Sequence, residues 1–284
     1  MNIKDALLEG KMLLDRNGVE GSKASAEYLL RVVLGMSKTE LARSGEQALS
    51  RDRYSKYRRW INRRAKHEPV WYITGQIEFY GQELTVTKNV LVPRPETELM
   101  IEKIIKNEQN NCAKVADIGT GSGAIILSLA NNLKGEFFAS DISKKALKIA
   151  KKNAKRLNHQ VTFKKGDLLE PWLGQRFNLI VANLPYISQE DMSKLAFDLV
   201  HYEPRTALDG GVAGLDVYRR FLKQLPLFLA DDAQVYCEIG HNQGEPLKKI
   251  ATQYLPKAEI MVEKDYGGVD RFLTITDRSD YHKQ

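Results

Sequence analysis

The sequence predicts a doubly wound α/β domain with an antiparallel last strand, preceded by a small all-helical domain and a β-hairpin linker. Apolar residues follow only helical spacing up to about residue 70, whereas residues 71–92 alternate, and strand and helix patterns alternate after that. At 284 residues the chain also exceeds the size at which one hydrophobic core usually keeps growing. We therefore expect a helical substrate-recognition domain at 1–72, a linker at 73–93 and a catalytic domain at 94–284.

The N-terminal part contains one strongly basic helix. Ser50 is a suitable N-cap, and the helix ends before Pro69. Its apolar face has 3-4-4 spacing, which predicts inward packing of Tyr54, Tyr57, Ile61 and Ala65. Against the single acid Asp52, the helix carries Arg51, Arg53, Lys56, Arg58, Arg59, Arg63, Arg64 and Lys66.

The linker has the pattern of a β-hairpin. Aromatic and β-branched residues alternate from Trp71 to Val92, and Gly81-Gln82 separates residues 78–80 from residues 84–86. A helix is expected over roughly residues 95–108, because Pro95 suits the first helical position.

The C-terminal part alternates strands and helices, which indicates a mostly parallel sheet. Strands are expected at 114–118, 136–140, 161–164, 177–182 and 234–239, and helices at 124–132 and 144–156. The last two strands, 260–263 and 272–275, are joined by residues 264–271, a connection shorter than the dozen residues of a parallel crossover. An antiparallel last strand on such a sheet is typical of class I methyltransferases and unlike a dinucleotide-binding sheet.

Composition excludes several classes of function. The N-terminus has no continuous apolar segment and no stretch approaches a membrane span of roughly 18 apolar residues, so we expect a cytoplasmic protein with no membrane partner. Cys112 and Cys237 are too few for a disulfide framework, and the five histidines lack metal-ligand spacing, so no metal is expected. The net charge of +7 favours acidic partners without by itself making the chain a nucleic-acid binder.

A glycine-rich turn between strand and helix predicts a cofactor site. Its residues are Asp117, Gly119, Thr120, Gly121, Ser122 and Gly123. Taken alone the turn is ambiguous, because Gly119, Gly121 and Ala124 also satisfy a nicotinamide-dinucleotide fingerprint. Asp117 favours S-adenosylmethionine, since a carboxylate there would face pyrophosphate unfavourably but would suit an ammonium and sulfonium group.

Two further strand ends supply the rest of the predicted cofactor site. Asp141 follows the second strand, where its carboxylate is placed to accept both ribose hydroxyls. Asp167 and Leu168 follow the third strand and offer an acceptor for the adenine amino group beside an apolar side chain. The alternative is that Asp117 and Asp167 only cap turns.

The segment Asn183-Leu184-Pro185-Tyr186 follows a buried-looking strand and resembles the Asn-Pro-Pro-Tyr signature of methyltransferases that modify planar nitrogens. The resemblance implies that the Asn183 oxygen and the Leu184 carbonyl accept the two N–H bonds of the target, that Tyr186 packs on the planar group and that Pro185 stiffens the turn. It also implies that Asn183 contacts the cofactor. An amide nitrogen is a poor nucleophile, so such a site must orient it rather than deprotonate it. Leu184 departs from the signature, and restoring proline is expected to be neutral or mildly activating if only the residue's carbonyl is used.

The resemblance extends along the whole chain to release-factor glutamine methyltransferases. It rests on residues 68–75, 78–81, 90–98 and 202–208 and on Gly210-Gly211. The family implies transfer of a methyl group from S-adenosylmethionine to the side-chain amide nitrogen of glutamine in the Gly-Gly-Gln loop of class I peptide-chain release factors, in support of translation termination. No stable nucleic-acid partner is expected.

Several interpretations stay open at this point. Arg94 and Glu96, with Glu203 and Arg205, either shape the substrate pocket or form structural ion pairs. The basic helix either docks an acidic release-factor surface or is a solvated face. Alternative functions are a glutamine methyltransferase acting on a large-subunit ribosomal protein and, in another class, a non-enzymatic RNA-binding module.

Overall fold

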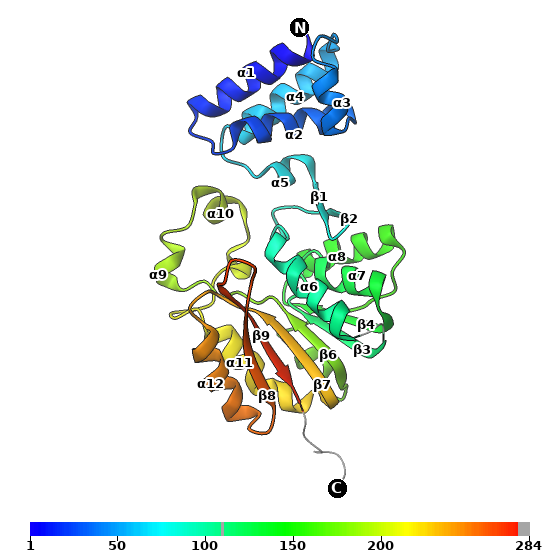
Figure 1. Ribbon diagram of the computed structural model, residues 1–284, viewed down its shortest axis with the longest axis vertical. Helices are drawn as coiled ribbons and strands as arrows, with labels where there is room; N and C mark the ends of the chain where they lie inside the picture. The colour runs from blue at the N-terminus through cyan, green and yellow to red at the C-terminus, as the bar shows by residue number, and fades with distance from the viewer. Residues whose placement is uncertain (109–110, 278–284) are drawn as a thin grey trace. The chain divides into compact units, whose positions relative to one another are not determined.

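The computed structural model describes residues 1–108 and 111–277 (Figure 1). The chain divides into two compact units: a helical unit of residues 1–76 and 196–202, and a sheet unit of residues 77–195 and the chain from residue 203 onward. The segment 196–202 lies in the range that the sequence analysis assigned to the third domain. Across the two described ranges, no helix combines the length and the apolar content that crossing a membrane requires.

Short helices build the helical unit. They are α1 (Ile3–Arg16), α2 (Ser22–Leu34), α3 (Lys38–Arg43), α4 (Arg51–Arg64), α5 (Val70–Thr74) and α10 (Phe197–Tyr202). The first turn of a helix has backbone N–H groups without an intrahelical partner, so a polar side chain placed before it stabilises the helix start. The side chains of Asn2, Ser37 and Ser50 each accept a hydrogen bond from such an N–H group.

The basic helix α4 forms as predicted, with Ser50 at its N-terminus. Tyr57 and Ile61 are buried in the core of the helical unit, and Tyr54 packs at its margin. The basic residues are not all free, because Arg63 makes a bidentate contact with Glu68 at 2.5 and 2.7 Å. The exposed charge of α4 therefore lies mainly on its earlier turns.

The segment containing α10 belongs to the helical unit and contacts the loop after α4 at two points. The Tyr202 hydroxyl donates to the Lys66 carbonyl at 2.8 Å. The His67 and Phe197 rings meet edge to face, with centroids 5.5 Å apart. Residues distant in sequence thus complete this unit, which no local pattern in the N-terminal part indicates.

The linker differs from its prediction at its beginning. Residues expected to start a strand form helix α5 instead, and Gly75 ends that helix in a left-handed conformation. The hairpin itself is confirmed as β1 (Gln76–Phe79) and β2 (Gln82–Thr85). Its turn is Tyr80-Gly81 rather than Gly81-Gln82, and both turn residues have positive φ, 47° and 71°, as a two-residue hairpin turn of type I′ requires.

The sheet unit contains a seven-stranded sheet of the predicted class. Its order is β5-β4-β3-β6-β7-β9-β8. The strands are β3 (Asn111–Ile118), β4 (Lys134–Asp141), β5 (Thr162–Lys165), β6 (Phe177–Ala182), β7 (Leu229–Glu238), β8 (Glu259–Lys264) and β9 (Asp270–Thr276). The neighbouring pairs from β5 to β7 are parallel, whereas β9 is antiparallel to both β7 and β8. This confirms the predicted antiparallel last strand.

Helices cover both faces of the sheet: α6, α7 and α8 lie on one face, and α11 and α12 on the other (Figure 1). Their bounds are α6 (Pro95–Glu108), α7 (Ala124–Asn132), α8 (Lys144–Leu157), α11 (Asp216–Gln224) and α12 (Gly244–Tyr254). Short turns of helix fill the connections, namely α9 (Gln189–Met192), η1 (Glu170–Trp172), η2 (Arg205–Ala207) and η3 (Leu225–Leu227). The predictions for α6, α7 and α8 are confirmed.

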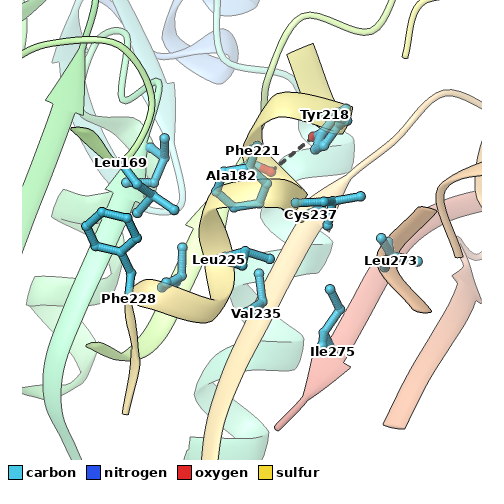
Figure 2. Packing of buried hydrophobic residues seen from close by; sticks show 14 of the residues in the cluster. Leu169, Ala182, Tyr218, Phe221, Leu225, Phe228, Val235, Cys237, Leu273 and Ile275 are labelled. Atoms are coloured by element: carbon cyan, nitrogen blue, oxygen red, sulfur yellow. Dashed lines mark hydrogen bonds between the residues drawn. The ribbon is translucent and has the colours of Figure 1, made fainter. Parts of the chain in front are cut away.

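A large cluster of buried side chains lies between the sheet and α11 and α12. Figure 2 shows Leu225 beside Val235 on β7 and Phe221 beside Ala182 on β6, and Ile275 on β9 belongs to the same cluster. Burying each large apolar side chain contributes roughly 1.5–3 kcal/mol. Because β6 has helices on both faces, its sequence is a nearly continuous apolar run rather than an alternating one.

Candidate active site

The register of the parallel strands brings the predicted segments to one edge of the sheet. Ile118 at the end of β3 pairs with Ser140 on β4 and with Ala182 on β6. The turn after β3, Asp141 and Asn183 are therefore neighbours. The chain passes from β3 to β4 on one side and returns to β6 on the other, so strand order reverses here. Doubly wound sheets bind their ligands at such points.

The glycine-rich turn needs glycine at two positions for different reasons. Gly119 has φ +77°, and a Cβ atom there would lie 3.0 Å from Leu184 Cδ2. Gly123 has φ +84°, and its Cβ would lie 3.1 Å from Leu127 Cδ1 and 3.3 Å from Ala150 Cβ. Gly119 thus lets the turn approach the Asn183–Tyr186 segment, and Gly123 lets the start of α7 pack closely on α8.

A buried amide that the sequence analysis missed holds the turn in place. Asn153 on α8 is fully buried, and its Nδ2 donates to the carbonyls of Ser122 at 2.9 Å and Thr85 at 3.0 Å. Its Oδ1 accepts from the Thr85 N–H at 2.8 Å. The hairpin and the turn are therefore joined through one side chain. In the sequence, Asn153 lies on the apolar face of α8 beside Ala150 and Ala154, and this position indicates that its side chain is buried.

A cavity of about 480 Å³ opens at this edge of the sheet. This volume is within the usual range for a small-molecule site. Among the predicted site residues, its wall includes Arg94, Gly119, Thr120, Gly121, Ser122, Asp141, Asp167, Leu168, Asn183, Leu184 and Pro185. The other predicted residues, all within the described part of the chain, lie outside that wall: Asp117, Glu96, Gly123 and Tyr186.

Asp117 lies behind the glycine-rich turn rather than in the cavity. Its side chain is fully buried, and its Oδ2 accepts a hydrogen bond from the Thr120 hydroxyl at 2.6 Å. Burial raises the pKa of the Asp117 carboxyl to about 7. Asp117 therefore supports the turn, and its contact with a cofactor stays a prediction.

Asp141 faces the cavity and also fixes the turn. Its Oδ2 accepts from the Gly121 N–H at 2.9 Å and its Oδ1 from the Ser143 N–H at 2.7 Å. A carboxylate has about four acceptor sites, so capacity remains for two hydroxyl groups. Burial raises the pKa of Asp141. The next residue, Ile142, was not predicted; it is 59% exposed and lines the cavity, which offers an apolar surface beside the carboxylate.

Asp167 and Leu168 both line the cavity, but Asp167 already has a partner. Its carboxylate forms an ion pair with Arg220 on α11. Leu168 is in the left-handed conformation with φ 49°, and the Ser140 hydroxyl donates to its carbonyl at 2.9 Å. A ligand group at Asp167 would therefore share this carboxylate with Arg220.

Asn183 has a specific partner on α6. Its Nδ2 donates to the Thr97 Oγ1 at 3.3 Å, and the Thr97 hydroxyl donates to Glu238 Oε2 at 2.5 Å. Thr97 lies within residues 90–98, which carry the family resemblance, but the sequence predicted Glu96 as the site residue. Helical spacing would have distinguished them, because Thr97, Met100 and Ile104 share the buried face of α6 whereas Glu96 is exposed.

Leu184, which stands where the family signature has proline, uses both its side chain and its N–H. Its side chain is buried in the main core, and its N–H donates to the Tyr218 hydroxyl at 3.2 Å. Tyr218 is itself fully buried and donates to the Glu238 carbonyl. A proline has no N–H to donate, so it would leave the Tyr218 oxygen without this donor. The effect of proline at residue 184 on activity stays a prediction, and the N–H contact gives a reason to expect lower stability.

Tyr186 is held at both ends. Its carbonyl accepts from Gln243 Nε2 at 2.7 Å, and its hydroxyl donates to Glu238 Oε1 at 3.4 Å. Burial raises the pKa of the Tyr186 hydroxyl to about 12, with the nearby Glu238 carboxylate adding to the shift. Gly214 passes so close that a Cβ there would lie 2.3 Å from the Tyr186 carbonyl oxygen.

The charged residues near α6 separate into two kinds. Arg94 lines the cavity, and its Nη2 donates to both carboxylate oxygens of Glu203 at 2.6 and 2.7 Å. It therefore forms an ion pair, and its role in shaping a substrate pocket stays a prediction. The Glu203 side chain is buried. Arg205 also lines the cavity and pairs with Asp209 at 3.3 Å. Glu96 is solvent-exposed and lies outside the cavity wall.

These residues suit a reaction that depends on orientation. One part of the cavity wall combines a glycine-rich turn, a carboxylate at Asp141 and apolar surfaces at Ile142 and Leu168. Another part presents Asn183, whose amide can hydrogen-bond but is not a base. A polar planar group bound there would be aligned rather than deprotonated.

Two protein-family models match the chain. The PrmC N-terminal domain matches residues 5–75. The methyltransferase small domain matches residues 95–234, which include the glycine-rich turn and the Asn183–Tyr186 segment.

Curated relatives match over nearly the whole chain. The release factor glutamine methyltransferase of Bacillus cereus is 37% identical over 280 residues, which cover 96% of this chain and 98% of the relative. That of Bacillus subtilis is 38% identical over 257 residues, covering 88% and 89%. That of Streptococcus pneumoniae is 36% identical over 269 residues, covering 94% and 95%.

Solved methyltransferase structures share the fold. A methyltransferase from Pyrococcus furiosus superposes with a TM-score of 0.54 at 16% identity, over 69% of this chain and 89% of that one. A 16S rRNA methyltransferase of T. thermophilus in complex with AdoMet and guanosine gives a TM-score of 0.52 at 16% identity, over 72% and 50%. At these identities the likeness concerns the fold alone.

Proposed function

Because the chain belongs to the release factor glutamine methyltransferase family, we propose that it methylates the side-chain amide nitrogen of the glutamine in the Gly-Gly-Gln motif of class I peptide-chain release factors, with S-adenosylmethionine as methyl donor. The chain is a protein-glutamine methyltransferase that acts on release factors. Beyond this activity, we propose three specific features. They are the amide nitrogen as the methylated atom, the Gly-Gly-Gln loop as the target and S-adenosylmethionine as the methyl donor. Modification of that loop would act on translation termination.

The residues of the cavity fit S-adenosylmethionine. The glycine-rich turn at 119–123 brings backbone close to the ligand, Asp141 has acceptor capacity for two hydroxyls, and Ile142 and Leu168 offer apolar surface to a base. The T. thermophilus neighbour with this fold binds AdoMet, which supports the same donor here. When bound, S-adenosylmethionine supplies an electrophilic methyl group on a sulfonium centre.

The acceptor end depends on the segment Asn183–Tyr186. The Asn183 Oδ1 and the Leu184 carbonyl would each accept one N–H of the target amide, which directs its nitrogen toward the methyl group. Because the amide lone pair is delocalised, this alignment matters more than removal of a proton. Pro185 lines the cavity and restricts the backbone of the segment.

One observation carries the proposal: Asn183 lies on the wall of the same cavity as the glycine-rich turn, with its Nδ2 already bound to Thr97. The amide oxygen is thus left for a donor in the cavity. A target with N–H groups fits this arrangement, and the amide of a glutamine side chain is such a target.

We further propose a division of labour along the chain, with residues 1–72 recognising the release factor, residues 73–93 linking and residues 94–284 carrying methyl transfer. The family-model matches at 5–75 and 95–234 support this division. The exposed basic residues of α4 would favour an acidic surface on the release factor.

A methyl-transfer assay tests the proposed function. Purified protein and radiolabelled S-adenosylmethionine are incubated with an intact release factor, with the same factor carrying Ala in place of the Gly-Gly-Gln glutamine, with a large-subunit ribosomal protein and with RNA. Label is expected on the intact factor only. Label on the Ala variant would exclude the assigned residue, and label on ribosomal protein or RNA alone would exclude the assigned substrate.

A further inference from the structure

A chain of buried hydrogen bonds leads from Asn183 to a carboxylate that the proposed reaction does not use. Asn183 Nδ2 donates to Thr97 Oγ1 at 3.3 Å, and Thr97 Oγ1 donates to Glu238 Oε2 at 2.5 Å. Thr97 and Glu238 are only 3% and 2% exposed. We call this chain, Asn183, Thr97 and Glu238, the amide relay.

The strand register explains why Glu238 lies at this place. β7 runs beside β6 with Cys237 level with Ala182, so the next residue on each strand, Glu238 and Asn183, reaches the same edge of the sheet. Thr97 is on the buried face of α6. A carboxylate at the end of a buried strand is costly to desolvate unless donors reach it. Here the donors to the Glu238 carboxylate are the Tyr186 hydroxyl and the Thr97 hydroxyl.

The amide relay can have only one direction while Glu238 is ionised. A carboxylate only accepts hydrogen bonds, so the single Thr97 hydroxyl proton must point to Glu238. The Thr97 oxygen then offers only lone pairs to Asn183, and only the Nδ2 end of the amide can satisfy them. The two ends of an amide have nearly the same shape, so its hydrogen bonds to Thr97 and to Glu238 decide which end faces the cavity.

The same carboxylate also contacts the last residue of the tetrapeptide. The Tyr186 hydroxyl donates to Glu238 Oε1 at 3.4 Å, while Thr97 occupies Oε2. Each Glu238 oxygen therefore has a donor, and one side chain is connected to both outer residues of the segment Asn183–Tyr186. This leaves the Asn183 oxygen as the acceptor that the cavity offers.

We propose that Glu238 and Thr97 are positioning residues for methyl transfer, which hold the Asn183 amide with its oxygen toward the target N–H. This inference rests on the proposed function, because it concerns how that acceptor is aimed. Neither residue touches the target; each acts through Asn183. Their loss should therefore lower kcat and leave cofactor affinity nearly unchanged.

The direction of the relay is sensitive to protonation of Glu238. Burial raises the pKa of Glu238, and this is opposed by the hydrogen bond from Thr97, by Arg271 on β9 and by Asn183; Glu96 on α6 raises it further. A protonated Glu238 becomes a donor to the Thr97 oxygen. The Thr97 hydroxyl can then donate to Asn183, which turns the amide and presents Nδ2 to the cavity. We expect kcat to fall at acid pH for this reason.

Four variants of the full chain test the relay. Thr97→Val and Glu238→Gln remove the fixed direction of the hydrogen bonds between Asn183, Thr97 and Glu238. Thr97→Ser keeps the hydroxyl and therefore keeps that direction. Thr274→Val is the matched control: Thr274 is buried on β9, and its hydroxyl has no hydrogen-bond partner among the described residues. Turnover of a Gly-Gly-Gln peptide, S-adenosylmethionine binding by calorimetry and thermal unfolding are measured for each.

Thr97→Val and Glu238→Gln should lower kcat about tenfold, with the dissociation constant for S-adenosylmethionine within about twofold of the parent. Thr97→Ser and Thr274→Val should stay within about twofold in both quantities. The decrease of kcat at acid pH should be present in the parent and absent from Glu238→Gln. Parent-like kcat in Thr97→Val, or an unchanged acid limb in Glu238→Gln, would overturn the inference.

A readout that needs no turnover separates this inference from the proposed function. The side-chain NH2 resonances of Asn183, assigned by their loss in Asn183→Asp, should shift in Thr97→Val and Glu238→Gln but not in Thr274→Val. Unchanged resonances in the first two variants would refute the relay. If the parent protein methylates no release factor while these shifts occur, the proposed function fails and the relay stands.

Discussion

The two loops that meet at the active-site edge are held by different means. The glycine-rich turn is fixed through its backbone: Asp141 accepts the Gly121 N–H, and Asn153 binds the Ser122 carbonyl. The tetrapeptide is fixed through its backbone as well, at the Leu184 N–H and the Tyr186 carbonyl. In addition its side chains are bound, because Asn183 binds Thr97 and the Tyr186 hydroxyl binds Glu238.

This difference follows from what each loop has to specify. A turn that binds a cofactor through its backbone needs a defined backbone conformation. Glycine and a few contacts to carbonyl or carboxylate groups can define it. A segment that aims a lone pair has to distinguish the oxygen from the nitrogen of an amide, which only a hydrogen bond of known direction does. Substitutions in the turn should therefore affect binding, and those in the tetrapeptide should affect rate.

The largest expected effect is at Asn183. Asn183→Ala removes the acceptor that strengthens as the nitrogen gains positive charge, so kcat should fall by roughly 10²–10³, with S-adenosylmethionine affinity nearly intact. Steady-state kinetics on a Gly-Gly-Gln peptide and calorimetry measure the two quantities. Asn183→Asp keeps an acceptor of similar shape and should retain partial activity. A native rate in Asn183→Ala would contradict the proposed mechanism.

The opposite pattern is expected at Asp141. Asp141→Ala removes the proposed acceptor for the ribose hydroxyls and leaves the Gly121 N–H without its acceptor, so S-adenosylmethionine should bind about 10–100-fold more weakly. Asp167→Ala is the comparison variant; because Asp167 is shared with Arg220, it should weaken binding less. Calorimetry decides both. Unchanged affinity in Asp141→Ala, or tight binding of a nicotinamide dinucleotide by the parent, would refute the cofactor assignment.

Leu184→Pro tests whether the tetrapeptide depends on its own backbone. The substitution removes the N–H that donates to the Tyr218 hydroxyl, and it removes side-chain packing from the core, so the free energy of unfolding should fall by about 1–2 kcal/mol. Chemical denaturation measures this change. The companion variant Tyr218→Phe removes the same bond without touching the tetrapeptide. If Leu184→Pro is as stable as the parent, the bond from the Leu184 N–H to Tyr218 does not contribute to the free energy of unfolding.

The smallest effect is expected on the surface of α4, which belongs to neither loop. Charge reversal at the exposed residues Arg58 and Arg59 should raise KM for intact release factor roughly threefold and leave kcat on a short peptide unchanged. Arg63 is unsuitable for this test because it pairs with Glu68. Reversal at Lys148 and Lys152, exposed on α8, controls for net charge. Equal effects on protein and peptide substrates would remove the docking idea.

Much of the sheet unit follows from the sequence. The limits of α7 and β6 agree with their predicted ranges, because a glycine precedes the helix and the strand is a continuous apolar run. The short connection between β8 and β9 was sufficient to predict an antiparallel pair. By contrast, α11 and α12 had no predicted element, although Tyr218, Phe221 and Leu222 have the spacing of a buried helical face.

The sequence by itself determined the order of elements, the glycine-rich turn and the tetrapeptide, since these depend on residues that are close together in the chain. Only the tertiary structure decided that Asp117 supports the turn from behind, that α10 joins the helical unit and that Thr97 and Glu238 meet Asn183. Thr97 and Glu238 are 141 residues apart, and no local pattern relates them. Their meeting depends on strand register and on helix packing against the sheet, which arise from the burial of the whole core.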